Sequence, residues 1–252
     1  MERSTRIKSA ETALRIVETI RELDGASVSE LAAELDRPTS TVHNYLQTLE
    51  ANEYLTKEDG TYRIGLRFLG LGKHIEDRLQ IREIAIPEID ELAERTGELA
   101  SLLLEEHDKG VYVYLHSGDK AVYLDARPGM RTYLHQTGLG KAILSAAGEA
   151  KVDSVIEAHG LPRATPNTIT DPDELKAEIE AIGERGYAID RGERVSGVRC
   201  VAVPIDPSGG EPVGAISVSG PKSRVKGEFF EEELPELVEE AANVIEINYR
   251  FA

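Results

Sequence analysis

The chain contains a single cysteine, no tryptophan and no long apolar run. Because Cys200 is the one cysteine in 252 residues, an internal disulfide framework and a cysteine-built zinc site are both excluded. A lone thiol is typical of proteins in a reducing cytoplasm. No apolar stretch approaches the roughly 18 residues of a membrane-spanning helix, and the N-terminal segment is charged throughout, unlike a signal peptide. We therefore expect a cytoplasmic protein that does not enter a membrane.

Lysine is also scarce, and acidic residues are in large excess. The sequence has 46 acidic and 29 basic residues, a formal net charge of −17, and only 10 of the basic residues are lysine. Excess carboxylates keep protein molecules apart when concentrated salt screens most other charge. This balance favours a salt-adapted, halophilic protein over an ordinary acidic one. Hydrophobic residues make up 40% of the chain, enough for a packed core in one large domain or two modest ones.

The first part of the chain has the pattern of three helices and a hairpin. Apolar residues recur at helical spacing over 9–23, over 27–35 and again from about Thr39. The second of these helices opens with a capping box, in which Ser27 is followed three residues later by glutamate. Asp59-Gly60 is typical of the turn of a two-stranded hairpin. Three helices and a wing predict a winged helix-turn-helix domain over residues 1–66.

The third predicted helix keeps short polar side chains on the face that does not pack. Asparagine and glutamine can read adenine edges, serine and threonine can contact phosphates, and the amides at a helix start favour an anion. A merely solvated face is the better interpretation for this helix alone, but the capped preceding helix and the wing favour double-stranded DNA. The predicted DNA contacts, which include basic residues of the N-terminal arm and the wing, are Arg6, Lys8, Thr39, Ser40, Thr41, His43, Asn44, Gln47, Lys57 and Arg63.

The negative charge is unevenly shared along the chain. Residues 1–70 hold 9 basic and 12 acidic side chains, which gives −3, and the remaining residues carry −14 of the total of −17. In molar salt the Debye length is only about 3 Å, so repulsion of DNA by the rest of the chain is weak there. Counterion release also adds little affinity under those conditions. We therefore expect DNA binding to depend on close contacts and on dimerisation.

The rest of the chain alternates groups of strands with groups of helices. A linker helix is predicted over 67–80 and a second helix from 81 to Gly97, where it ends. Predicted strands cover 99–105, 110–116, 121–126, 186–190, 198–205 and 213–219, and predicted helices cover 138–147, 149–158, 173–185 and 228–249. Strands grouped before and after helices indicate an antiparallel sheet with helices packed on it, an α+β domain over residues 81–252.

Several stretches together resemble the IclR family of transcriptional regulators. In the first domain these are ALRIVETIRELDGASVSELAAELDRPTSTVHNYLQTLEANEYL and YRIGLRFLGLG; in the second they are LHQTGLGKAILSA, GYAIDRGERVSGVRCVAVPI and GAISVSGP. The resemblance covers nearly the whole chain. It implies a GAF-like effector domain, a small metabolite as signal, homodimers or dimers of dimers, and a near-palindromic operator. Two positions depart from the family pattern: Asn44 stands where a basic residue is frequent, and Gly192 stands where a second acid is frequent.

The resemblance also implies an effector site in the second domain. Its contacts carry over by motif to Gly138, Leu139, Asp190, Cys200, Ser217 and Ser219. The residues themselves are compatible with such a site, because glycines at a helix start leave amides accessible and residues two apart on a strand share a face. The alternatives are a small buried thiol at Cys200, a turn cap at Asp190 and an exposed strand face for the serines. A small organic acid or a sugar-derived metabolite suits such a pocket equally well.

The sequence shows no signature of catalysis or of cofactor binding. The six histidines have no metal-ligand spacing, no serine has the context of a nucleophile elbow, and no phosphate loop or dinucleotide fingerprint is present. We therefore predict no cofactor, no metal, no catalytic residue and no enzyme activity. Two alternatives remain open, in which a winged-helix appendage regulates either a metabolite-sensing enzyme or a protein-interaction module.

Overall fold

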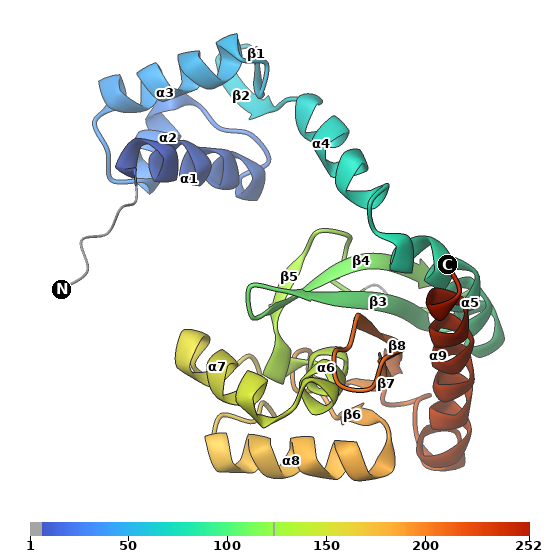
Figure 1. Cartoon of the computed structure of the whole chain (residues 1–252). Coiled ribbons are helices and arrows are strands. Elements are labelled where there is room, and N and C mark those ends of the chain that lie inside the picture. The colour runs from blue at the N-terminus through green and yellow to red at the C-terminus, as the bar shows by residue number, and fades with distance from the viewer. Residues whose placement is uncertain (1–6, 123) are drawn as a thin grey trace. The chain divides into compact units, whose positions relative to one another are not determined.

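A computed structural model describes residues 7–122 and 124–252, and the chain divides into two compact units (Figure 1). The first unit is Met1–Arg78 and the second is Leu79–Ala252. The first holds the predicted winged helix-turn-helix, and the second holds the predicted antiparallel sheet with its flanking helices. The α+β fold class inferred from the sequence is therefore confirmed.

The first unit consists of three helices, a hairpin and one further helix. Its elements are α1 (Lys8–Glu22), α2 (Val28–Glu34), α3 (Thr39–Ala51), β1 (Leu55–Glu58), β2 (Thr61–Ile64) and α4 (Arg67–Glu76). Ile16 and Ile20 of α1, Leu31 of α2 and Leu46 of α3 meet in one buried core with Tyr62 of the wing. This apolar contact explains why the three short helices form together, since none is long enough to be stable alone.

Local chemistry fixes the ends of these elements. The Glu30 amide donates to the Ser27 hydroxyl over 3.3 Å, and the Ser27 amide donates to the Glu30 carboxylate over 2.8 Å, so the predicted capping box is formed. Asp59 and Gly60 have φ of +48° and +84°, the paired left-handed conformations of a type I′ hairpin turn. A bridge from Ala26 to Tyr62 joins the wing to the start of α2.

The second unit is built on a six-stranded antiparallel sheet. Its strands are β3 (Leu99–Glu106), β4 (Lys109–Ser117), β5 (Arg131–Tyr133), β6 (Ala188–Asp190), β7 (Val198–Ile205) and β8 (Gly214–Pro221). Their order across the sheet is β5-β4-β3-β8-β7-β6. The central pair β3 and β8 comes from opposite ends of the unit, so the two groups of strands separated by helices in the sequence form a single sheet.

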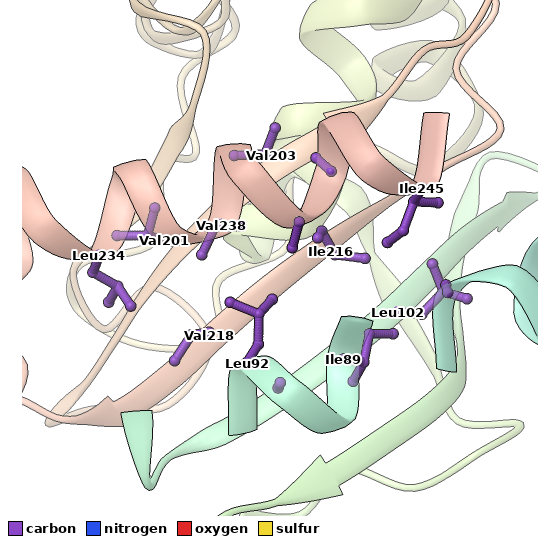
Figure 2. Packing of buried hydrophobic residues seen from close by; sticks show 14 of the residues in the cluster. Ile89, Leu92, Leu102, Val201, Val203, Ile216, Val218, Leu234, Val238 and Ile245 are labelled. Atoms are coloured by element: carbon purple, nitrogen blue, oxygen red, sulfur yellow. The ribbon is translucent and has the colours of Figure 1, made fainter. Parts of the chain in front are cut away.

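Helices cover both faces of this sheet. On one face lie α5 (Gln80–Thr96) and α9 (Leu234–Arg250), whose Ile89, Leu92, Val238 and Ile245 point toward the strands (Figure 2). On the other face lie α6 (Gly138–Ala147), α7 (Glu149–His159) and α8 (Pro172–Arg185), which share a second core with alternate strand residues. Because side chains alternate along a strand, β7 sends Val201 and Val203 to the first core and Cys200 and Ala202 to the second.

Two sequence predictions for the second unit need correction. Residues 121, 122 and 124–126 form no strand. Instead β5 pairs with the first residues of β4, from Arg131 opposite Val111 to Tyr133 opposite Lys109. Apolar residues at 121–126 suggested a strand, but Leu124 and Ala126 face a cavity. The predicted C-terminal helix also begins with a π-helical stretch, Phe229–Glu233, before α9 starts at Leu234.

Candidate functional site

The polar face of α3 is the first candidate site. Val42 and Leu46 are buried, as their spacing predicted, while Ser40, Asn44 and Gln47 are exposed. Thr39 is exposed, and Thr41 and His43 are partly exposed. The residue before the helix is Pro38, whose side chain has no polar group to cap the first-turn amides. The face carries hydrogen-bonding groups without a lysine or arginine between Thr39 and Ala51.

The basic residues predicted to contact DNA differ in their exposure and in the partners they already have. Lys8 is exposed at the first position of α1, and the Lys57 ammonium lies 5.0 Å from the centroid of the Tyr62 ring. Arg63 is already engaged, because its Nη1 donates to the Asp24 carbonyl over 2.6 Å. This hydrogen bond joins the wing to the turn after α1, and the Arg63 side chain as a whole is about half exposed, at 52%. Arg6 lies outside the described residues.

One basic residue beside α3 was not among the DNA contacts predicted from the sequence. Arg37 is exposed immediately before Pro38, and within the described ranges no hydrogen bond or ion pair is recorded for its side chain. Asp36, with φ +50°, turns the chain there. A cation placed just before the start of a predicted recognition helix was the available signal.

The second candidate site is a small cavity of about 30 Å³ in the second unit, here named the effector cavity. Its lining joins strands β3, β4, β6, β7 and β8, the start of α6 and the segments around 124–126 and 194–198. The lining residues are Leu99, Ser101, Tyr112, Leu124, Ala126, Thr137, Gly138, Leu139, Asp190, Arg194, Val195, Val198, Cys200 and Ser219. Five of the six residues that the resemblance implied thus line one cavity: Gly138, Leu139, Asp190, Cys200 and Ser219.

The sixth, Ser217, lies behind the cavity wall. Its side chain is fully buried, and its hydroxyl is 3.0 Å from that of Ser101, with which it shares a hydrogen bond. Ser101 lies directly across from Ser217 in the β3–β8 pairing and itself lines the cavity. Sequence reasoning missed Ser101 because its partner strand lies far along the chain, and only the register joins the two.

Glycine at position 138 lets α6 begin directly against the strands. A methyl group placed there would lie 3.2 Å from Cys200 Sγ and 3.5 Å from Asp190 Cβ. The first turn of α6 is capped from outside the helix, since Thr137 Oγ1 accepts from the Gly140 amide over 3.0 Å. A helix start therefore faces the cavity, where its dipole favours a negatively charged group.

Asp190 has two roles at the cavity wall. Its Oδ1 accepts from the amides of Gly192 and Glu193 over 2.8 and 2.7 Å, so it caps the turn after β6, and it also faces the cavity. Burial raises the pKa of its carboxyl above the ordinary value. Burial also raises the pKa of the Cys200 thiol to about 12. A neutral buried thiol is a poor nucleophile, so Cys200 is a wall residue.

A buried lysine holds the Asp190 turn against α6. Lys141, 1% exposed, donates from Nζ to the Ile189 carbonyl over 2.8 Å and to Glu193 Oε1 over 2.7 Å, and lies 3.4 Å from Glu178 Oε1. Burial raises the pKa of Glu193 to about 7, although Lys141 opposes the shift. This cluster of buried charged residues was not predicted from the sequence. The available signal was a lysine inside the apolar run of α6 and an acid after β6.

Other concave surfaces are less specific. One groove of about 580 Å³ runs over α7 and α8, and another of about 170 Å³ lies over α5 and α9. Among the described residues, no group of histidine, cysteine or acidic side chains could hold a metal ion. No helix in the described ranges is long and apolar enough to cross a membrane.

Comparison with known proteins identifies both units. The IclR helix-turn-helix domain matches residues 9–59, and the bacterial transcriptional regulator IclR C-terminal domain matches residues 73–247. The chain is 31% identical over 251 residues to the probable HTH-type transcriptional regulator ArcR of Halobacterium salinarum, covering 98% of this chain and 95% of that one. It is 31% identical to the HTH-type transcriptional regulator XynR of Escherichia coli, covering 87% and 88%.

Solved structures give the same answer. The Thermotoga maritima IclR structure matches with a TM-score of 0.77 and 32% identity, covering 96% of this chain and 99% of that one. An IclR homologue from Microbacterium hydrocarbonoxydans, complexed with 4-hydroxybenzoate, matches with a TM-score of 0.81 and 27% identity, covering 96% and 98%. The curated relatives are named as HTH-type transcriptional regulators, not as enzymes. The chain therefore belongs to the IclR family of transcriptional regulators, with an N-terminal helix-turn-helix domain that binds DNA.

Proposed function

We propose that this regulator binds a near-palindromic operator as a homodimer or a dimer of dimers, and that a small metabolite in the effector cavity alters this binding. The carrying observation is the effector cavity itself, where Asp190, Cys200 and Ser219 meet the first turn of α6. A 4-hydroxybenzoate complex of a Microbacterium relative supports an organic acid as the effector. A sugar-derived metabolite remains the second candidate class.

In this proposal α3 reads bases and its surroundings hold phosphates. His43, Asn44 and Gln47 project from a helix face that lacks cations, so they suit base edges better than phosphates. Thr39, Ser40 and Thr41 lie at the helix start, where amides and hydroxyls suit a phosphate. The cations that approach the backbone are Arg6, Lys8, Arg37, Lys57 and the exposed part of Arg63.

The apolar surface of α4 supports a dimer. No residue of α4 is buried within its own chain, although Leu69 and Ile75 are large and apolar, with exposures of 70% and 58%. Leu66, just before the helix, is 83% exposed. Large apolar side chains gathered on one exposed helix are typical of an interface. A second copy related by a two-fold axis covers this surface and presents a second α3, as a palindromic site requires.

Effector control follows from the size of the effector cavity. A volume of about 30 Å³ has room for about two waters, and a metabolite with six or more heavy atoms needs several times that space. Binding therefore requires a wider arrangement of the cavity walls. An effector shifts the chain toward the wider arrangement by as much as it binds that arrangement more tightly than the narrow one. We propose that the linker helix transmits the change to the DNA-binding domains.

We propose three further features on the same grounds. The chain comprises a DNA-binding domain at 1–66, a linker helix at 67–80 and a GAF-like effector and oligomerisation domain at 81–252. The net charge of −17 and the Halobacterium salinarum relative support a halophilic protein that works in concentrated salt. A cytoplasmic location agrees with DNA as the partner.

Footprinting of the DNA upstream of the gene, in molar salt, tests the proposal. We expect two protected half-sites whose centres are about 10 base pairs apart or a multiple of that spacing. The matched control is the triple substitution His43→Ala, Asn44→Ala and Gln47→Ala, which should abolish protection while light scattering still reports the same oligomer. Absence of any protected site, with or without small acids and sugars, contradicts the proposal.

A further inference from the structure

We propose that Arg194 makes the effector cavity select a ligand that carries a carboxylate over an uncharged analogue of the same shape. The inference rests on the proposed effector function and goes beyond it, because it chooses between the two ligand classes. It also assigns a specificity-determining role to a residue outside the six that the family resemblance implied.

Arg194 is the one lysine or arginine among the residues that line the effector cavity. Asp190 is the one acid in the same lining, and its two amide donors already occupy Oδ1. Arg194 is partly buried, and a guanidinium that is partly removed from water attracts an anion more strongly than one fully surrounded by water. The cavity therefore offers a strong binding position for a negatively charged group.

The guanidinium is held in place by one of its nitrogens. Nη2 donates to the Asp125 carbonyl over 2.6 Å and lies 3.6 Å from Met130 Sδ, and the Tyr112 ring centroid is 5.8 Å from the guanidinium carbon. Within the described ranges no partner is recorded for Nη1 or Nε. An arginine that is fixed at one end and has free donors at the other is preorganised for a carboxylate.

The remaining walls fit a small hydroxy or aromatic acid. The first turn of α6, at Gly138 and Leu139, favours negative charge through its dipole. Ser101 and Ser219 offer hydroxyls that suit an oxygen elsewhere on the ligand, and Leu99 and Val198 offer apolar surface for its body. A neutral sugar derivative would use the hydroxyls but would offer no charged acceptor to the partly buried guanidinium of Arg194, so it would lack the charge-assisted hydrogen bonds that a carboxylate forms.

Arg194 could instead serve only to fasten the segment that contains Asp125 and Met130. The two roles differ in what they predict for uncharged ligands. If Arg194 binds the carboxylate, its removal weakens the binding of acids and leaves the binding of amides unchanged. If it only positions the segment, both kinds of ligand weaken together.

The test compares acids with their amides on the full-length protein. The probes are lactate, benzoate and 4-hydroxybenzoate, each beside lactamide, benzamide or 4-hydroxybenzamide, with binding measured by calorimetry in molar salt. Wild type is expected to prefer at least one acid. Arg194→Gln should weaken the binding of that acid by roughly 10- to 150-fold and should change the affinity for its amide by less than about threefold. Arg194→Lys, which keeps the charge and loses the fork, should fall between.

Arg191→Gln is the matched control, because it removes the same charge from an exposed position outside the cavity lining, and it should bind like wild type. Near-UV circular dichroism of Arg194→Gln reports whether the unit stays folded. Equal losses for acid and amide, an unchanged affinity for the acid, or a wild-type preference for amides would each overturn the assignment to Arg194. Failure of wild type to bind any probe overturns the carboxylate class, and footprinting on the same sample shows separately whether operator binding stands.

Discussion

Replacing Lys141 by methionine should destabilise the second unit by about 3–5 kcal/mol, the usual cost of removing one partner of a buried ion pair and the middle of the range of about 2.5–6 kcal/mol that the lost contacts give. The substitution keeps the apolar stem and removes the Nζ that donates to Glu193 over 2.7 Å and to the Ile189 carbonyl over 2.8 Å. Loss of the hydrogen bond to a carboxylate is worth about 1.5–3 kcal/mol, and leaving a buried carbonyl without a donor costs about 1–3 kcal/mol. Because methionine fills the space, no cavity penalty is added.

The assay is urea or thermal unfolding of the purified chain at constant salt and at pH 8, above the pKa of about 7 of Glu193, so that Glu193 is a carboxylate. For a unit of 150–250 residues, about 1 kcal/mol lowers Tm by about 2–4 °C, so Lys141→Met should lower it by about 6–20 °C. Lys176→Met is the matched control, since the Lys176–Asp153 pair has the same 2.7 Å separation but lies on an exposed helix face. Its effect should fall within the error of the measurement.

A double-mutant cycle with Glu193→Gln separates the pair from the rest of the cluster. The two single losses should exceed the loss of the double variant by about 1–3 kcal/mol, as for other residues in direct contact. A Lys141→Met variant as stable as wild type would refute the reasoning that this cluster holds the Asp190 turn in place.

Three further predictions concern pH, base reading and assembly. Burial raises the folded-state pKa of Glu193 from 4.5 to about 7. The contribution of Glu193 to the free energy of unfolding should therefore be full below pH 4.5 and should be lost as the pH rises through 7. Denaturation experiments across pH 4–8 should show this decline, and Glu193→Gln should make the pH dependence flatter. Asn44→Ala and Gln47→Ala should each reduce discrimination against altered operator bases by about 1–3 kcal/mol, measured by competition binding, whereas equal loss on all sequences would indicate phosphate contacts. Leu69→Ser with Ile75→Ser should shift the chain toward monomer in light scattering and weaken operator binding without changing the Tm of the second unit, and an unchanged oligomer would place the interface elsewhere.

Local sequence rules predicted the first unit almost completely. The Ser27 capping box, the Asp59-Gly60 turn and the spacing of Val42 and Leu46 act over a few residues, and each is formed as predicted. The face of α3 that remains polar follows from the same spacing. Arg63 is the exception, because its bond to the Asp24 carbonyl joins residues far apart in the chain.

In the second unit, the pairing of one edge strand and part of the cavity lining could not be predicted from the sequence. The stretch 121–126 has strand composition, but β5 occupies the position beside β4, and a residue pattern cannot reveal which of two segments pairs with an edge. Ser101 and Arg194 reach the effector cavity only through the packing of distant segments. Ser217 was implied by the family resemblance, and strand alternation places it on the same face as Ser219 but does not give its depth of burial.

The most direct test of the account is the effect of a bound effector on operator affinity. An acid that stabilises the chain in a thermal-shift screen should change the operator dissociation constant by about 5- to 150-fold, measured by fluorescence anisotropy in molar salt. The same acid should have no effect on operator binding by a variant whose effector cavity no longer binds it. An acid that binds in the effector cavity and leaves the operator affinity unchanged would contradict the proposal that this cavity controls DNA binding.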